Sequence, residues 1–447
     1  MRQRMVGNAA DSGTLLARLT FFLGFSLPFP GLLLPGATSS PRYTDLAVAL
    51  CIPFAWSLYN RTIRSSTTVP FMLAWQAAIV VPAVVHYLTF GNFVIADYVY
   101  YLRWILAIAL AAPLAQIMPG NSRLQRAFLL GIIFGASLHI LTIWFASIGG
   151  KPLLLQIGFA SPRVKDTTYF GETRITSLSE HANNAMILIA MSVPAAVSYR
   201  LVAPRDKGLW IIGMSLVLLV IGFYFTLTRS ATLAAGIAIM VGVLQFFKRS
   251  EKSAIWFRVV FVVLAALMIL LAIQLSRFEV GQDRLAERIA SKGLDKNLAG
   301  RLHTIEATID LLLHHPLGTG WSQFLKRITL ADGLTASHNG YLFTARIMGI
   351  PLLLLIVIGH ARLLWRIAST RRIDALPPMI CFLLVVMFAE DVTQGMSMVF
   401  LVIFMAFCGY KFAPWASTLY RSVMVPPAAS PRGRMSPGRM TGVPLKR

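Results

Sequence analysis

Three arginines and one histidine stand beside apolar segments in an arrangement that suits phosphate chemistry. Arg174 precedes one apolar run, and Arg229 lies in a short polar link between two others. Arg301 begins an amphipathic segment, and His338 directly precedes a further apolar run. Guanidinium groups stay charged and donate paired hydrogen bonds to phosphate oxygens, while an imidazole with an ordinary pKa of about 6.5 can take a proton at neutral pH. These residues predict a diphosphate site with a proton acceptor beside it.

No metal ion or other cofactor is expected in this site. The chain contains no Asp-x-Asp or Asp-x-Glu pair, so a divalent metal held by carboxylates is not expected. Its three cysteines all lie in apolar runs without metal-ligand spacing. The arginines would therefore neutralise the diphosphate in place of a metal.

Polar residues next to these groups are candidates for substrate binding. In the segment 176–185, His181 and Asn184 share one helical face if a helix begins near Ser179, and Asn183 reaches the headgroup region or a cavity. This cluster alone is equally consistent with a capped helix start. Likewise Arg229 alone could be an interfacial anchor that extends toward lipid headgroups. The gathering of all the clusters at one water–membrane boundary favours a function.

The elements that must position these residues are membrane helices. The chain has 447 residues, of which 56% are hydrophobic and only 13% charged, with a mean hydropathy of +0.68, whereas a soluble protein carries about 25% charged residues. A soluble enzyme, a disordered chain and a disulfide scaffold are excluded. The sequence predicts an all-α polytopic membrane protein. Twelve spans are expected near residues 14–34, 44–60, 69–89, 98–118, 127–148, 182–200, 208–226, 230–247, 254–275, 340–360, 376–391 and 396–413.

The net charge of +23 is a topology signal. With the N-terminus in the cytoplasm and alternating spans, most of the positive excess falls in cytoplasmic segments, as the positive-inside rule requires. It would favour contact with anionic lipids and requires no nucleic-acid partner. Both termini are then cytoplasmic, and every candidate residue faces outside. Residues 1–421 would form one transmembrane domain, and residues 422–447, rich in Pro, Gly, Ser and Arg, a disordered basic cytoplasmic tail.

Two outside loops are long, residues 149–181 and 276–339. In the larger loop, Leu302, Ile305, Ile309 and Leu312 recur at helical spacing. This amphipathic helix lies on the membrane surface or packs on the bundle.

Four further polar residues lie inside spans. Arg103 and Arg346 stand a short way from the outer ends of their spans and are interpreted as lipid-phosphate contacts or as side chains that extend to the headgroups. His86 and His139 lie deeper and are interpreted as hydrogen-bonded core histidines.

Four motifs follow one another along residues 170–355. They are Arg174…His181-Ala-Asn183, Thr-Arg229-Ser230, Gly300-Arg301…Pro316-Leu-Gly318-Thr-Gly320…Phe324, and Ser-His338-Asn339-Gly-Tyr341-Leu342…Met-Gly349-Ile. Their order and their place on one membrane side resemble the O-antigen ligase and polysaccharide polymerase superfamily of bacterial inner membranes. Thr228 and Ala182 depart from the family pattern, which leaves the substrate more open than the reaction.

The resemblance implies a C-type membrane glycosyltransferase fold and a metal-independent transfer of a glycan from undecaprenyl diphosphate on the periplasmic face. A ligase moves the glycan to lipid A-core, and a polymerase moves it to a growing polysaccharide. The resemblance also implies residue roles: Arg229 and Arg301 hold the donor diphosphate and His338 activates the acceptor. The implied substrate-binding residues are Arg174, His181, Asn183, Asn339 and Tyr341.

Three functions are weighed. The leading one is an O-antigen ligase, and the second is an exopolysaccharide or O-antigen repeat-unit polymerase. The third is a lipid-linked sugar flippase or transporter. Transporters usually place ionisable residues near the bilayer midplane and show inverted repeats, whereas the charges here gather at one face and no repeat is visible.

Overall fold

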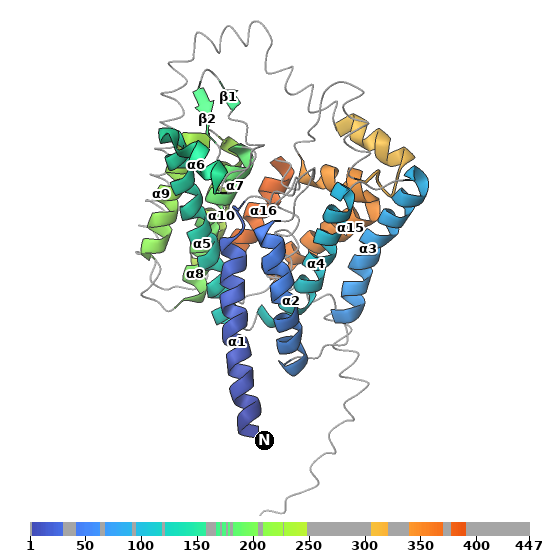
Figure 1. Cartoon of the computed structure of the whole chain (residues 1–447), viewed down its shortest axis with the longest axis horizontal. Coiled ribbons are helices and arrows are strands. Elements are labelled where there is room, and N and C mark those ends of the chain that lie inside the picture. Colours follow the sequence, from blue (N-terminus) through green and yellow to red (C-terminus); the bar gives the residue numbers. More distant parts are fainter. Residues whose placement is uncertain are drawn as a thin grey trace, which may run out of the picture. The chain divides into compact units, whose positions relative to one another are not determined.

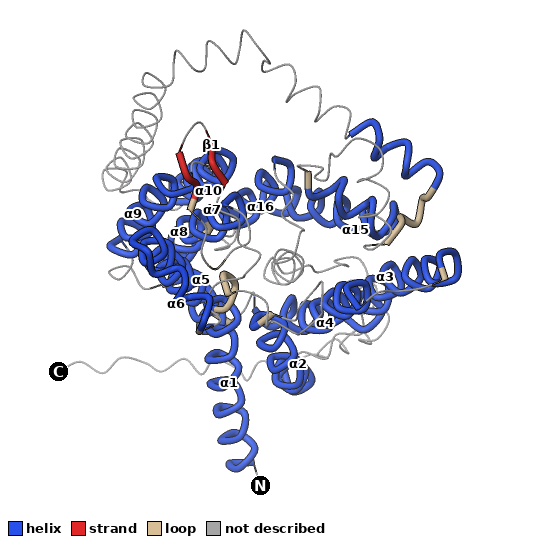
Figure 2. Tube along the Cα trace, turned by 45° about the horizontal axis from the view of Figure 1, so that its top comes forward, coloured by secondary structure: helices blue, strands red, loops and turns tan. Residues whose placement is uncertain are grey.

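The computed structural model describes fourteen stretches of the chain, all within the compact unit Met1–Tyr410. They are residues 2–29, 42–62, 68–91, 95–118, 121–157, 167–169, 172–175, 178, 182–203, 209–226, 228–247, 305–320, 339–369 and 377–389. These residues form mainly helices, and the one sheet among them is a two-stranded hairpin (Figures 1 and 2).

The helices agree with a polytopic membrane protein. They are α1 (Arg2–Phe25), α2 (Tyr43–Thr62), α3 (Thr68–Phe90), α4 (Ile95–Ile117), α5 (Ser122–Phe145), α6 (Lys151–Gln156), α7 (Ala182–Ala190), α8 (Ser192–Val202), α9 (Leu209–Thr226), α10 (Arg229–Phe247), α15 (Gly340–Ser369) and α16 (Pro377–Ala389). Residues 305–314 add a further helix.

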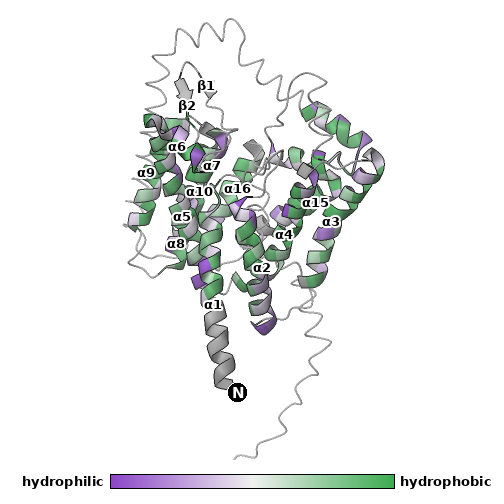
Figure 3. Ribbon diagram, in the orientation of Figure 1, coloured by the Kyte–Doolittle hydropathy of each residue, from purple (hydrophilic) through white to green (hydrophobic). Residues whose placement is uncertain are grey.

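Six of the described helical segments are long and apolar enough to cross a membrane. They are Met72–Thr89, Asp97–Ile117, Ser122–Gln156, Ala182–Val202, Leu209–Thr226 and Gly340–Ala361. Much of their ribbon is coloured hydrophobic in Figure 3. The expected spans 254–275 and 396–413, like the tail 422–447, lie outside the described residues, so the count of twelve stays a prediction.

The first helix is displaced along the sequence from its expected span. The span was predicted over 14–34, but α1 runs from Arg2 to Phe25. The chain leaves the helix at Ser26, and Pro28 follows, whose ring disfavours helical backbone before it and which lacks an N–H group. A prediction from apolar content alone ran through this proline.

Glycines bring α1 and α5 into close contact. A Cβ on Gly24 would stand 2.5 Å from the carbonyl oxygen of Phe128, and one on Gly135 would stand 2.7 Å from that of Phe25. Small residues at such a seam let two membrane helices approach closely. Because Phe21 meets Gly131 and Phe25 meets Gly135, the two helices run parallel. Alternating spans require this direction for the first and fifth crossings.

A small apolar core joins α5, α7 and α9. Its fully or nearly buried members are Ala136, Ile140, Ile143, Ala185, Ile189 and Leu218. α10 packs against α7, α8 and α16, and α16 in turn packs against α15. These contacts hold α7 and α10 against each other.

The helix α15 folds back on itself at Gly349. This glycine has φ +82° and ψ 177°, a backbone conformation that only glycine adopts readily, and Pro351 begins the second arm. The hydroxyl of Tyr341 nevertheless lies 3.1 Å from Nδ1 of His360. A straight helix would separate these residues by about 28 Å. The expected span over 340–360 is long and apolar enough to cross a membrane, but it is bent: a short arm, 340–348, lies back against the longer one.

Both long loops contain structure among their described residues. After α5 the chain makes a π-helical turn (Ala146–Gly150), forms α6, and then pairs β1 (Thr167–Tyr169) antiparallel with β2 (Glu172–Arg174). The amphipathic helix of the larger loop is confirmed over 305–314. Leu312 on its inner face is buried, so this helix packs on protein along one side.

Candidate functional site

The start of α7 touches the start of α10. The hydroxyl of Thr228 donates a hydrogen bond of 3.2 Å to Oδ1 of Asn183, and Thr228 is 3% exposed. Arg229 is the next residue and the first of α10. Two motifs that are 45 residues apart thus meet through a partly buried polar contact.

Arg174 is brought to the same region by the main chain. Arg174 ends strand β2, where it pairs with Thr167. The next residue, Ile175, donates its N–H to the carbonyl oxygen of Phe225 near the end of α9. Since α9 leads directly to Thr228 and Arg229, the backbones of Arg174, Asn183 and Arg229 gather at one end of α7, α9 and α10. His181 lies outside the described residues.

A second group of contacts surrounds the bend of α15. The N–H of Thr319 donates to the carbonyl oxygen of Arg346 at 2.8 Å, that of Gly320 to Ile347 at 3.1 Å, and that of Ile350 to Pro316 at 2.8 Å. The segment 316–320 therefore runs along both sides of Gly349. Gly318 and Gly320 have φ of +80° and +73°, in the left-handed region that favours glycine. The PLGTG motif therefore forms a turn that its glycines permit, and this turn pairs with the bend of α15.

His86 ties this turn to α3 and α4. Its Nε2 lies 3.0 Å from the carbonyl oxygen of Leu317, and its Nδ1 lies 2.7 Å from the hydroxyl of Tyr101. The interpretation as a hydrogen-bonded core histidine is confirmed. Its partner Leu317 stands 231 residues away, and nothing in the local sequence signals that link.

The start of α15 is capped by a candidate residue. Oδ1 of Asn339 accepts hydrogen bonds from the N–H groups of Tyr341 and Leu342, at 3.0 and 3.1 Å, which satisfies two of the unpaired donors at the helix start. Tyr341 contacts His360 as described above. Arg301 and His338 lie outside the described residues, four residues before the start of the helix 305–314 and one residue before the cap Asn339.

The two groups are linked through α16, which packs against both α10 and α15. The described residues therefore bring Arg174, Asn183 and Arg229 together at the backbone level, and bring Asn339 and Tyr341 together at the start of α15.

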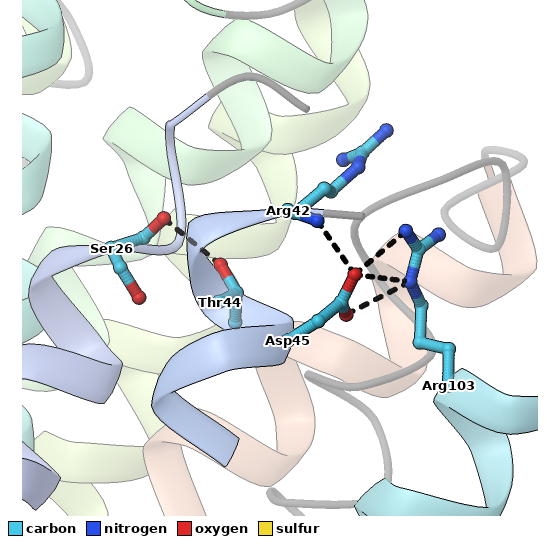
Figure 4. A network of polar contacts seen from close by, with 5 residues as sticks. All are labelled: Ser26, Arg42, Thr44, Asp45 and Arg103. Carbon is cyan, nitrogen blue, oxygen red and sulfur yellow. Dashed lines mark hydrogen bonds and ion pairs between the residues drawn. The ribbon is translucent and has the colours of Figure 1, made fainter. Parts of the chain in front are cut away.

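Arg103 and Arg346 are not lipid-facing side chains. Arg103 is 5% exposed and holds Asp45 of α2 with two nitrogens, at 2.8 to 3.0 Å. The same carboxylate accepts from the N–H of Arg42, and the hydroxyl of Thr44 donates to the carbonyl oxygen of Ser26 (Figure 4). The interpretation of Arg103 as a lipid-phosphate contact is wrong, because Asp45 already neutralises it inside the protein. Arg346 is 3% exposed, so it is buried in protein too.

His139 on α5 is also a core residue. It is fully buried, and neither ring nitrogen has a hydrogen-bond partner among the described residues. The expectation of a buried histidine is confirmed, while the expected hydrogen bonds are not found within this part of the chain.

Part of the chain matches the model of a known family. Residues 214–357 match the O-antigen ligase family model. The matched segment contains Arg229, Arg301, His338, the 316–320 turn and the bend at Gly349, and it begins after Arg174 and Asn183. The resemblance to the O-antigen ligase and polysaccharide polymerase superfamily is thereby confirmed. No curated protein matches the chain.

Proposed function

We propose that this protein is a metal-independent glycosyltransferase that moves a glycan from undecaprenyl diphosphate to an acceptor, of the O-antigen ligase type. The match of residues 214–357 to the O-antigen ligase family supports a glycan-transferring ligase or polymerase. The hydrogen bond between Thr228 and Asn183 supports a single shared site. It joins two of the candidate motifs at one place, as a shared substrate site requires.

In the proposed reaction the acceptor hydroxyl oxygen bonds to the anomeric carbon of the donor glycan as the bond from that carbon to the phosphate oxygen breaks. His338 takes the hydroxyl proton. Undecaprenyl diphosphate leaves with the bonding electron pair. Arg229 and Arg301, assisted by Arg174, stabilise the negative charge that grows on its phosphates.

The remaining candidates would orient the glycan and the acceptor. The candidates proposed for this role are His181, Asn183, Asn339 and Tyr341. Hydrogen bonds to Thr228 and to main-chain N–H groups fix the amide planes of Asn183 and Asn339. Fixed amides bind a sugar at a lower entropic cost than mobile ones.

The site is proposed to face the periplasm, in a bacterial inner membrane with both chain termini in the cytoplasm. The lipid tail of the donor would stay in the bilayer while its diphosphate sits at the interface. The acceptor is proposed to be lipid A-core.

Substitution of the proposed catalytic residues tests the reaction. In a deletion strain, complementation with Arg229→Ala or His338→Ala should abolish surface polysaccharide at unchanged protein insertion. Arg229→Lys should recover only part of it, because an ammonium keeps the charge but not the paired hydrogen bonds. Arg123→Ala is the matched control, since Arg123 is exposed at the start of α5. Normal polysaccharide with either alanine variant would refute the reaction proposed here.

The same strain separates the alternatives. A ligase deletion should accumulate long lipid-linked polymer, whereas accumulated single repeat units would identify a repeat-unit polymerase. Transport of a lipid-linked sugar by the purified protein, with no glycosidic bond formed, would identify a flippase instead.

A further inference from the structure

We propose that His86 is a positioning residue for this glycosyl transfer: it anchors the 316–320 turn and, through it, the bent helix that follows His338. The inference rests on the proposed function. It concerns a residue of α3, outside the segment that matches the ligase family.

The hydrogen-bond partners of His86 fix its tautomer. A carbonyl oxygen only accepts, so the Nε2 that faces Leu317 O carries the proton. In the neutral ring, Nδ1 is then an acceptor, and the Tyr101 hydroxyl donates to it at 2.7 Å. Tyr101 therefore sets the ring so that its one N–H is aimed at the turn.

The turn fits against this ring without spare room. A Cβ on Gly320 would stand 3.1 Å from Nδ1 of His86 and 3.3 Å from the hydroxyl of Tyr101. Both side chains are almost fully buried, at 2% and 5% exposure. The turn is thus held from α3 and α4 by packing as well as by the hydrogen bond.

The anchored turn connects to the two described segments that adjoin Arg301 and His338 in the sequence. On one side it follows the helix 305–314, which begins four residues after Arg301. On the other side its N–H groups bond to the carbonyl oxygens of Arg346 and Ile347, in the short arm that begins two residues after His338. A shift of the turn would move the base relative to the diphosphate cradle, and a misplacement of about 1 Å can cost on the order of a hundredfold in rate.

Two amide variants isolate the hydrogen bond to Leu317. His86→Gln places an amide nitrogen near the position of Nε2 and can still donate to Leu317 O. His86→Asn places one near Nδ1 and cannot reach. His86→Leu removes both contacts. His139→Leu is the matched control, because it makes the same change at another fully buried histidine.

The first measurement is the initial rate at which surface glycan appears in the complemented deletion strain, per inserted protein. His86→Leu and His86→Asn should lower this rate roughly tenfold or more. His86→Gln should recover most of it, and His139→Leu should leave it unchanged. If His86→Leu does not insert, Tyr101→Phe takes its place, since it removes only the hydroxyl that orients the ring.

The second measurement is independent of activity. Hydrogen–deuterium exchange of peptides covering 316–320 should accelerate in His86→Leu and His86→Asn but not in His86→Gln. Unchanged exchange in His86→Leu would overturn the anchoring, whatever the reaction is. Accelerated exchange with an unchanged rate would overturn the positioning role while leaving the transferase intact. Normal glycan in His338→Ala would instead count against the proposed function alone.

Discussion

Thr228 donates its hydroxyl to the side-chain oxygen of Asn183 and so holds the starts of α7 and α10 side by side. Thr228 directly precedes Arg229 in the sequence. The contact fixes the first turn of α10, and therefore the place from which the Arg229 side chain leaves the backbone.

Removing this hydroxyl should weaken transfer without unfolding the protein. Thr228→Val keeps the shape of the side chain but leaves Oδ1 of Asn183 without this donor. Loss of one such hydrogen bond costs about 1 kcal/mol. If the whole loss raises the barrier to transfer through a displaced Arg229, the rate of glycan transfer should fall roughly fivefold. Thr228→Ser keeps the hydroxyl and should retain the rate. Both are measured as glycan appearance per inserted protein.

A double-mutant cycle decides whether the bond itself is responsible. The double variant Asn183→Leu/Thr228→Val should transfer glycan no more slowly than Asn183→Leu alone, because the hydrogen bond is already lost in the single variant. Additive losses would show that the two residues act separately.

The bend in α15 should depend on Gly349. Any other residue would have to adopt φ +82°, and its Cβ would meet the main chain of Leu317. Gly349→Ala should therefore lower the free energy of unfolding by about 2 kcal/mol or more, read as a lower Tm in detergent. Gly213→Ala is the matched control: this helical glycine has open space around it, and alanine should be neutral or up to about 1 kcal/mol stabilising. Equal Tm values for both variants would contradict the importance of the bend.

Apolar runs predicted the helices well where each run matches one straight helix. The predicted span 208–226 is α9 at 209–226, and 376–391 is α16 at 377–389. The bend of α15 was missed because hydropathy averages over Gly349 and Pro351, although this pair is itself a local signal for a turn. The contact of His86 with Leu317 and the pairing of Arg103 with Asp45 could not be predicted, because each depends on which helices pack together.

The ion pair of Asp45 and Arg103 should be costly to break from one side. Asp45→Leu leaves the guanidinium of Arg103 buried without its carboxylate, and such a change costs about 3 to 5 kcal/mol of unfolding free energy. Asp45→Leu combined with Arg103→Leu should recover much of this loss, because no charge remains buried. Tm in detergent and the amount of inserted protein measure both. If Asp45→Leu alone has no effect, the pair contributes nothing and the guanidinium finds other partners.

The helix 305–314 should rest on the membrane surface on the proposed periplasmic side, with its exposed apolar side chains facing the lipid. Leu312 faces the protein and is buried, but Ile309 and Leu313 are 49% and 75% exposed. They lie next to each other on one stripe, since residues four apart are neighbours on a helix. The helix 305–314 leads directly into the turn that is hydrogen-bonded through Leu317 to His86 on α3. Helix α3 is a candidate membrane span and carries many exposed apolar side chains. A photocrosslinking residue in place of Leu313 should therefore form lipid adducts in membranes, whereas the same residue in place of the exposed Ala307, about 120° around the helix, should form few. Equal labelling at the two positions would place the helix away from the bilayer.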